Sequence, residues 1–311
     1  MQPIPITILA GSDHRPGPLP KDGPELHSLG VYKGAEVTVK ERPLIDLLIE
    51  QIEKSGSFSP ITIAGPSEVY TPLNLNATIV DTNGSVATNL RAAMENHQER
   101  FGDQPIALLA YDVLVQAHEL DELRQKYEQQ SPCAIWVPFV EMPTKKEELG
   151  AFGWKPTYGM YPEKGAEKIQ VLPGHLAIMQ PSQMRLRLLY RLLDLAYKTR
   201  NHSVATRRKV MLRSVLGNLI SEDFRALMKF HAPNLMVSVI SNGLLIANQL
   251  RRGELTIPEL EKAIGSIFLK PGAHSKRPGE GVRHPVVDIL SLAEDVDTEE
   301  EAAGLEEEIG D

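Results

Sequence analysis

The chain has 311 residues, 42% of them hydrophobic, and a single cysteine, Cys133, so it can bury a full core but forms no internal disulfide and no cysteine zinc site. The formal net charge of -8 arises from residues 294–311, which hold ten acids and no Lys or Arg; without them the charge of residues 1–293 is about +2. The body is near neutral and lacks the clustered Lys and Arg with interleaved aromatics of a typical nucleic-acid-binding face, which excludes that class of protein. No apolar run is long enough to span a membrane. The single cysteine and the lack of a signal-peptide pattern predict a cytoplasmic protein.

The N-terminal segment combines a strand with a polar loop. Residues 6–9 are apolar and mostly β-branched, which predicts the central strand of an α/β sheet, and Ala10 and Gly11 begin the loop after it. Open α/β sheets bind ligands at loops of this kind, and Gly11 permits close approach to backbone N–H groups. Arg15 and Lys21 add two cations able to neutralise a triphosphate. The alternative is a solvated surface loop with two ordinary surface cations.

Helices and strands then alternate through the first half of the chain. Leu44, Leu48 and Ile52 form the apolar stripe of a helix that Gly56 ends, and a second strand covers residues 60–64. Further strands are predicted over residues 77–81, 105–110 and 133–139, and further helices from residue 86 and over residues 117–130. The run at 105–110 is apolar throughout, as a parallel strand buried on both faces requires. This alternation predicts an α/β fold with three layers around a mostly parallel, doubly wound sheet.

The second half of the chain has a weaker periodicity. A helical insertion or appendage is predicted at about residues 182–266, and the apolar run at 235–250 is interpreted as a buried helix within it. Two stretches rich in Pro and Gly, residues 152–165 and 271–285, are typical of long loops that cover a site or stay mobile. Residues 294–311 form an acidic tail, and the chain, residues 1–311, is expected to be a single domain.

Two groups of acids are candidate metal ligands. Asp112 follows the apolar 105–110 strand, at the same sheet edge as the Gly11 loop, and Mg²⁺ takes one or two carboxylates together with phosphates and water. A helix N-cap or a salt-bridge partner is the alternative for this residue. Asp295 and Asp297 are two residues apart, so on a strand both carboxylates face the same way. A capped helix start at Thr298 is the alternative for this pair.

The order of these motifs resembles the nucleotidyltransferases of the glycosyltransferase-A-like superfamily, which include the MobA-like transferases. Those proteins open with a strand, then Leu-Ala-Gly-Gly, a loop with Arg and Lys, and Gly-x-Pro-Leu-Ile leading into a helix. The matching segments here are Leu9-Ala10-Gly11-Ser12, Arg15, Lys21 and Pro43-Leu44-Ile45. In the superfamily, the acid comparable to Asp112 binds metal, and the Asp-x-Asp acids comparable to Asp295 and Asp297 contribute to the metal site. Residues 171–177, where His175 replaces the usual Asn, and residues 206–217 resemble two later motifs.

The resemblance implies a Mg²⁺-dependent nucleotidyltransferase that joins a nucleoside triphosphate to a phosphorylated acceptor and releases pyrophosphate. It implies that Leu9, Ala10, Gly11 and Ser12 contact the nucleotide, that Arg15 and Lys21 act on the phosphates, and that Asp112 holds Mg²⁺. Ser85 and Asn89, at a helix start, are candidates for contacts with the base or sugar, although a plain helix cap explains them as well. For His175 a structural role is the alternative to a catalytic one.

The loop also departs from the superfamily pattern. Ser12 stands at the second glycine position, Pro16 replaces a Met and removes an N–H donor, and the loop is about two residues shorter than in many relatives. A catalytically degenerate relative that binds a nucleotide or a partner is therefore one alternative. A nucleotide-sugar-dependent glycosyltransferase is the other, and the lack of an Asp-x-Asp motif at residues 110–112 counts against it.

Overall fold

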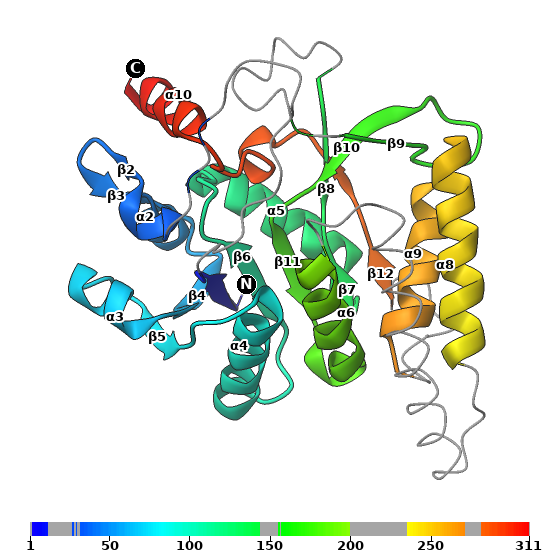
Figure 1. Cartoon of the computed structure of the whole chain (residues 1–311), viewed down its shortest axis with the longest axis horizontal. Coiled ribbons are helices and arrows are strands. Elements are labelled where there is room, and N and C mark those ends of the chain that lie inside the picture. Colours follow the sequence, from blue (N-terminus) through cyan, green and yellow to red (C-terminus); the bar gives the residue numbers. More distant parts are fainter. Residues whose placement is uncertain are drawn as a thin grey trace.

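The computed structural model describes residues 2–11, 27, 29, 32–143, 155, 157–199, 235–270 and 281–310 (Figure 1). Three residues of the predicted phosphate loop, Ser12, Arg15 and Lys21, lie outside these ranges.

A seven-stranded sheet forms the centre of the molecule, in the order β12-β7-β11-β6-β1-β4-β5. All neighbouring strands are parallel except β11, which is antiparallel to both β6 and β7. The predicted mostly parallel sheet is therefore confirmed. The first strand, β1, is an interior strand as expected, but the middle place belongs to β6. The strands are β1 (Ile4–Leu9), β4 (Phe58–Gly65), β5 (Thr78–Asp81), β6 (Ile106–Ala110), β7 (Ile135–Trp136), β11 (Leu176–Met179) and β12 (Val282–Arg283).

Helices cover both faces of this sheet, which gives the three layers (Figure 1). On β6, Ala107 and Leu109 pack into the core beneath α2 and α5, while Ile106 and Leu108 pack into a second core beneath α4 and α6. Because successive strand side chains point to opposite faces, a strand buried on both sides is apolar throughout. The helices are α2 (Leu44–Ser55), α4 (Val86–Phe101), α5 (Ala117–Gln130) and α6 (Leu186–Thr199). Gly56 ends α2 with a φ of 64°, as its position predicted.

A second sheet has four strands in the order β13-β8-β10-β9, and all four come from the C-terminal half or the end of the first half of the sequence, after residue 138. The single strand predicted over residues 133–139 is instead two short strands, β7 in the first sheet and β8 in the second, because Pro138 between them has no N–H to donate to a ladder. The predicted loop at residues 152–165 contains the short strand β9. The predicted loop at residues 271–285 contains the short strand β12, and its residues 271–280 lie outside the described ranges. The strands are β8 (Phe139–Glu141), β9 (Tyr158–Met160), β10 (Ile169–Pro173) and β13 (Val286–Val287).

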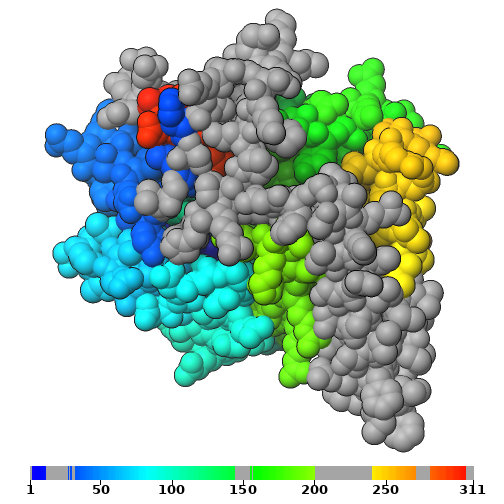
Figure 2. Space-filling model, in the orientation of Figure 1, coloured from blue at the N-terminus to red at the C-terminus, as the bar shows by residue number. Residues whose placement is uncertain are grey.

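The run at 235–250 is a helix, but the prediction that it is buried is wrong. In α8 (Leu235–Arg252), the side chains of Leu244 and Leu245 are 58% and 48% exposed, and α8 lies at the edge of the molecule (Figure 2). The helix turns a polar residue toward its neighbour α9 (Ile257–Phe268), since the Asn242 amide donates to the Ser266 hydroxyl at 2.9 Å. Among the described residues, no helix is both long and apolar enough to cross a bilayer.

The remaining elements are short or terminal. A hairpin of β2 (Thr38–Val39) and β3 (Arg42–Pro43) follows the single turn α1 (Lys33–Glu36), and α3 (Ser67–Tyr70) continues into the 3₁₀ turn η1 (Thr71–Leu73). Two further 3₁₀ turns are η3 (Pro181–Gln183) and η4 (Leu290–Leu292). The last helix, α10 (Glu299–Gly310), lies beside the β2–β3 hairpin (Figure 1).

Candidate metal and nucleotide site

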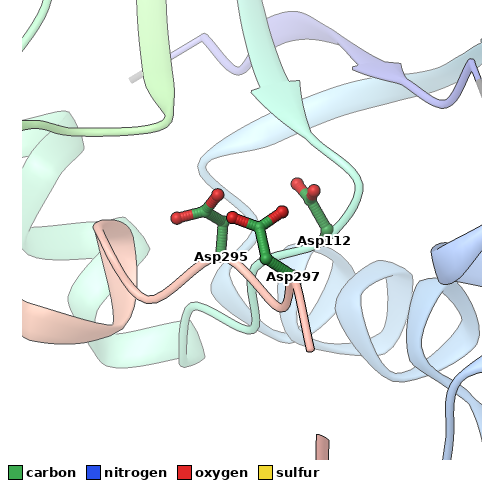
Figure 3. Close-up of side chains that lie close together, drawn as sticks. All are labelled: Asp112, Asp295 and Asp297. Carbon is green, nitrogen blue, oxygen red and sulfur yellow. The ribbon is translucent and has the colours of Figure 1, made fainter. Parts of the chain in front are cut away.

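Three aspartates predicted from two distant segments converge at one place (Figure 3). Asp112 follows β6, and Asp295 and Asp297 precede α10; one carboxylate oxygen from each lies within 4.8 Å of the other two. A backbone hydrogen bond of 2.8 Å from the Val296 N–H to the Asp112 carbonyl joins the two segments. Residues 294–297 are irregular and not the strand that the spacing suggested, yet both carboxylates turn toward Asp112. The capping alternative also holds, because the Thr298 hydroxyl accepts from the Glu301 N–H at 3.2 Å.

Two buried lysines that the sequence did not single out contact these acids. The Lys33 ammonium lies 2.5 Å from an Asp297 oxygen and 3.3 Å from an Asp112 oxygen, and its side chain is 4% exposed. The Lys155 ammonium lies 2.6 Å from an Asp295 oxygen, 3.6 Å from Asp297 and 3.5 Å from Glu301. Lysine is almost never buried unless it is paired, so these contacts explain both burials.

The ionisation of the cluster follows from burial and from these charges. Burial by itself would lower the pKa values of Lys33 and Lys155, but the surrounding carboxylates outweigh it and raise both. Burial raises the pKa of Asp112, against the opposing attraction of Lys33. Burial would also raise the pKa of Asp295, but His175 and Lys155 outweigh it and lower that pKa to about 2. The two ammonium groups therefore stay charged at neutral pH.

The residues fit a hard divalent cation. Mg²⁺ binds oxygen ligands and keeps room for water and phosphate, and all three aspartates are only partly buried. Among the described residues, carboxylates outnumber the ammonium groups of the cluster; the acids are Asp112, Asp295, Asp297 and Glu301, the lysines are Lys33 and Lys155, and His175 adds a positive charge when it is protonated. A site rich in carboxylates suits a divalent cation. Such a cation would compete with Lys33 for Asp297, so metal binding and the Lys33 contact are linked.

The start of the predicted nucleotide loop lies against the N-terminus of α4. The Ala10 N–H donates to the Ala64 carbonyl at 2.9 Å, so Leu9 and Ala10 continue the ladder of β1 and β4. A Cβ on Gly11 would lie 1.9 Å from the amide nitrogen of Asn89, which shows why this position requires glycine. Gly11 and Asn89, two candidates 78 residues apart in the sequence, are thus in direct contact.

The two polar candidates of α4 have different environments. The Asn89 side chain is 3% exposed and is held by the Thr82 hydroxyl, which donates to its oxygen at 3.0 Å. Ser85 is the N-cap of α4 and accepts from the Thr88 N–H at 3.3 Å, as the capping alternative predicted. Asn89 therefore shapes the loop start, whereas Ser85 is explained by the helix itself.

His175 lies inside the cluster and not in the core. It sits in the turn between β10 and β11, where its Nε2 is 3.5 Å from an Asp295 oxygen. A pocket of about 300 Å³ opens beside it, lined by Lys155, Tyr158, Leu172, Pro173, His175, Ala293, Asp295 and Asp297. Two of the three metal-ligand candidates, Asp295 and Asp297, therefore line a pocket to which the second sheet contributes Tyr158, Leu172 and Pro173.

The sequence held weak signals for the residues that were missed. Lys33 is followed by Gly34, where a Cβ would lie 2.7 Å from the Tyr111 ring, so this Lys-Gly pair packs against the segment that carries Asp112. Lys155 belongs to the 152–165 stretch that was predicted to cover a site, but nothing distinguished it from the other residues there. Glu301 stands three residues after Thr298, the spacing of a capping box, which indicates a helix start and not a site.

Comparison with known proteins extends the resemblance to the fold. No family model matches the chain, and no curated protein matches its sequence. A hypothetical transferase from Thermus thermophilus matches with a TM-score of 0.52 and 18% identity, over 97% of this chain and 100% of that one. A CMP:2-keto-3-deoxy-manno-octonic acid synthetase complexed with CTP matches with a TM-score of 0.41 and 11% identity, over 70% and 84% of the two chains. HddC from Yersinia pseudotuberculosis, complexed with GMP-PN, matches with a TM-score of 0.38 and 14% identity, over 60% and 79%.

The likeness to the Thermus thermophilus transferase covers both chains almost completely and concerns the fold. The mostly parallel central sheet with helices on both faces is the architecture that the sequence motifs implied. This chain therefore shares its overall fold with that transferase.

Proposed function

We propose that the chain is a Mg²⁺-dependent nucleotidyltransferase. An oxygen of a phosphorylated acceptor attacks the α-phosphorus of a nucleoside triphosphate, the new P–O bond forms, and the bond to the β-phosphate breaks to release pyrophosphate. The observation that carries this proposal is the convergence of Asp112, Asp295 and Asp297 at the sheet edge where β1 leads into Gly11. Chemistry of this kind depends on positioning and charge neutralisation and needs no protein nucleophile.

The three aspartates would hold the cation, which when bound neutralises charge on the phosphates. Lys33 completes this side of the site. An ammonium group has three N–H donors, and within the described part of the chain Lys33 donates to Asp112 and Asp297, so a third N–H would be available for a phosphate oxygen. Arg15 and Lys21 are the further cations that we assign to the triphosphate, on the sequence pattern alone.

The acceptor would enter the pocket beside Asp295. Lys155 and His175 line it and offer positive charge and hydrogen-bond donors to a phosphate, and the aromatic ring of Tyr158 stands at its wall. The acceptor phosphate would then reach the α-phosphorus from the side of the pocket that Tyr158, Leu172 and Pro173 of the second sheet line. The pocket volume of about 300 Å³ suits a small molecule.

The direct test is pyrophosphate release with a panel of nucleoside triphosphates and phosphorylated acceptors, with and without Mg²⁺. Asp112→Asn keeps the shape of the side chain and removes its charge, so Mg²⁺-dependent nucleotide affinity is expected to fall tenfold or more, about 1.4 kcal/mol. Asp297→Asn is expected to have a similar but smaller effect. Asp288→Asn, an identical change at an exposed position of the same C-terminal region, is the matched control.

Two outcomes would contradict the proposal in different ways. Nucleotide binding without pyrophosphate release for any substrate pair would identify a non-catalytic nucleotide-binding protein. Unchanged Mg²⁺-dependent affinity in Asp112→Asn, measured by isothermal titration, would remove Asp112 from the metal site.

A further inference from the structure

Glu301 is a fully buried carboxylate beneath the aspartate cluster. It lies in the first turn of α10 and its side chain is 0% exposed. One of its oxygens accepts from the backbone N–H of Asp297 at 2.6 Å and from that of Thr298 at 3.0 Å. The other oxygen lies 3.5 Å from the Lys155 ammonium. A single carboxylate therefore touches both the backbone of one candidate metal ligand and the cation paired to another.

The same turn is bonded to the other segments of the site. The Leu29 N–H donates to the Asp297 carbonyl at 3.0 Å, and the Glu299 N–H donates to the His27 carbonyl at 3.0 Å. His27 also donates its backbone N–H to Glu300, at 3.1 Å. His27 and Leu29 follow the predicted phosphate loop in the sequence, so these hydrogen bonds connect the segment after that loop with the metal-ligand candidates.

We propose that Glu301 is a positioning residue for the metal site, and this inference rests on the proposed nucleotidyltransferase function. Glu301 fixes the backbone from which the Asp297 carboxylate projects, and its other oxygen attracts the Lys155 ammonium, which also contacts Asp295. Hydrogen bonds to a charged acceptor are stronger and shorter than neutral ones, which suits a group that must hold a ligand in place. Glu301 does not touch the cation; it acts through Asp297 and Lys155.

Two substitutions separate its charge from its reach. Glu301→Asp keeps the negative charge but withdraws the carboxylate by one methylene, so it no longer spans from the Asp297 N–H to Lys155. Glu301→Gln keeps the length and an acceptor oxygen for the backbone N–H groups but loses the charged contact to Lys155. Glu299→Gln is the matched control, because Glu299 lies in the same turn of α10, is exposed, and loses the same charge.

The experiment measures Mn²⁺ affinity by isothermal titration of the full chain, together with thermal unfolding. Both Glu301 variants are expected to weaken Mn²⁺ binding at least fivefold, whereas Glu299→Gln stays within twofold of the wild type. A weakened Glu301→Asp variant shows that the position of the carboxylate matters in addition to its charge, because this variant keeps the charge. With active protein, both variants are expected to raise the Mg²⁺ concentration needed for half-maximal rate more than they lower the rate at saturating Mg²⁺.

The outcomes distinguish this inference from the proposed function. A wild type that binds Mn²⁺ together with Glu301 variants that bind it equally well would overturn the role of Glu301 alone. A lower unfolding temperature with unchanged Mn²⁺ affinity would likewise reduce Glu301 to a helix cap. A wild type that does not bind Mn²⁺ would overturn the metal site itself, and with it the positioning role.

Discussion

Replacing Gly11 by alanine tests whether close packing against Asn89 fixes the start of the predicted nucleotide loop. The added Cβ would lie 1.9 Å from the Asn89 amide nitrogen, far inside the ordinary contact distance of about 3.5 to 4.0 Å, so one of the two groups must move. Asn89 is buried and bonded to Thr82 and to the Gly84 carbonyl, and moving its amide breaks both hydrogen bonds. Leaving buried polar groups unpaired predicts a loss of about 2 to 4 kcal/mol in the free energy of unfolding.

A double-mutant cycle isolates this contact. In an Asn89→Ala background the obstructing amide is absent, so Gly11→Ala is expected to cost less than about 1 kcal/mol there, and the difference is the coupling between the two residues. Urea denaturation of the four proteins supplies the free energies. The reasoning would be refuted if Gly11→Ala cost the same in both backgrounds, since the strain would then lie elsewhere in the loop.

Three further predictions concern other parts of the structure. Lys33→Met removes the ammonium group that contacts Asp112 and Asp297, leaves Asp297 with the longer 3.6 Å contact to Lys155, and is expected to cost about 1 to 3 kcal/mol of stability. Because Mg²⁺ would no longer compete with Lys33, it is expected to raise the unfolding temperature of this variant more than that of the wild type; an equal rise would contradict the linkage. Burial lowers the pKa of His284 below the ordinary value of about 6.5. The free energy of unfolding is therefore expected to fall as the pH drops from that value toward the folded-state pKa. In the His284→Gln variant, a series of urea denaturations over this pH range should show a smaller fall. Leu244→Gln, on the exposed side of α8, is expected to change the free energy of unfolding by less than about 0.5 kcal/mol, and a loss above about 2 kcal/mol would show that this side is covered.

Local patterns in the sequence were sufficient for much of the central sheet. The apolar 105–110 run predicted β6, and the stripe that begins at Leu44 and ends at Gly56 predicted α2 almost to the residue. These elements depend on side-chain periodicity and on turn chemistry, which involve residues close together in the sequence. The same signals failed at α8, where the apolar content predicted burial but Asn242 faces α9 and Leu244 faces outward.

Some residues of the candidate site could be proposed from the sequence and then located in the structure, and others could not. The sequence proposed the acids, because Asp112 ends an apolar strand and Asp295 and Asp297 have an alternating spacing, and the structure brings these three together. The roles of Ser12, Arg15 and Lys21 stay predictions, since these residues lie outside the described ranges.

The sequence by itself determined where the strands and helices of the sheet run and which acids stand at its edge, because hydrophobic period and turn residues act over a few neighbouring positions. Only the tertiary structure decided that Lys33, 79 residues from Asp112, and Lys155, 140 residues from Asp295, pair with those acids. Lys33 lies in a single helical turn and Lys155 outside any helix or strand, so neither carries a periodicity that reveals its partner. Their pairing is set by the burial that the whole fold imposes, since an ammonium group removed from water must find a carboxylate there.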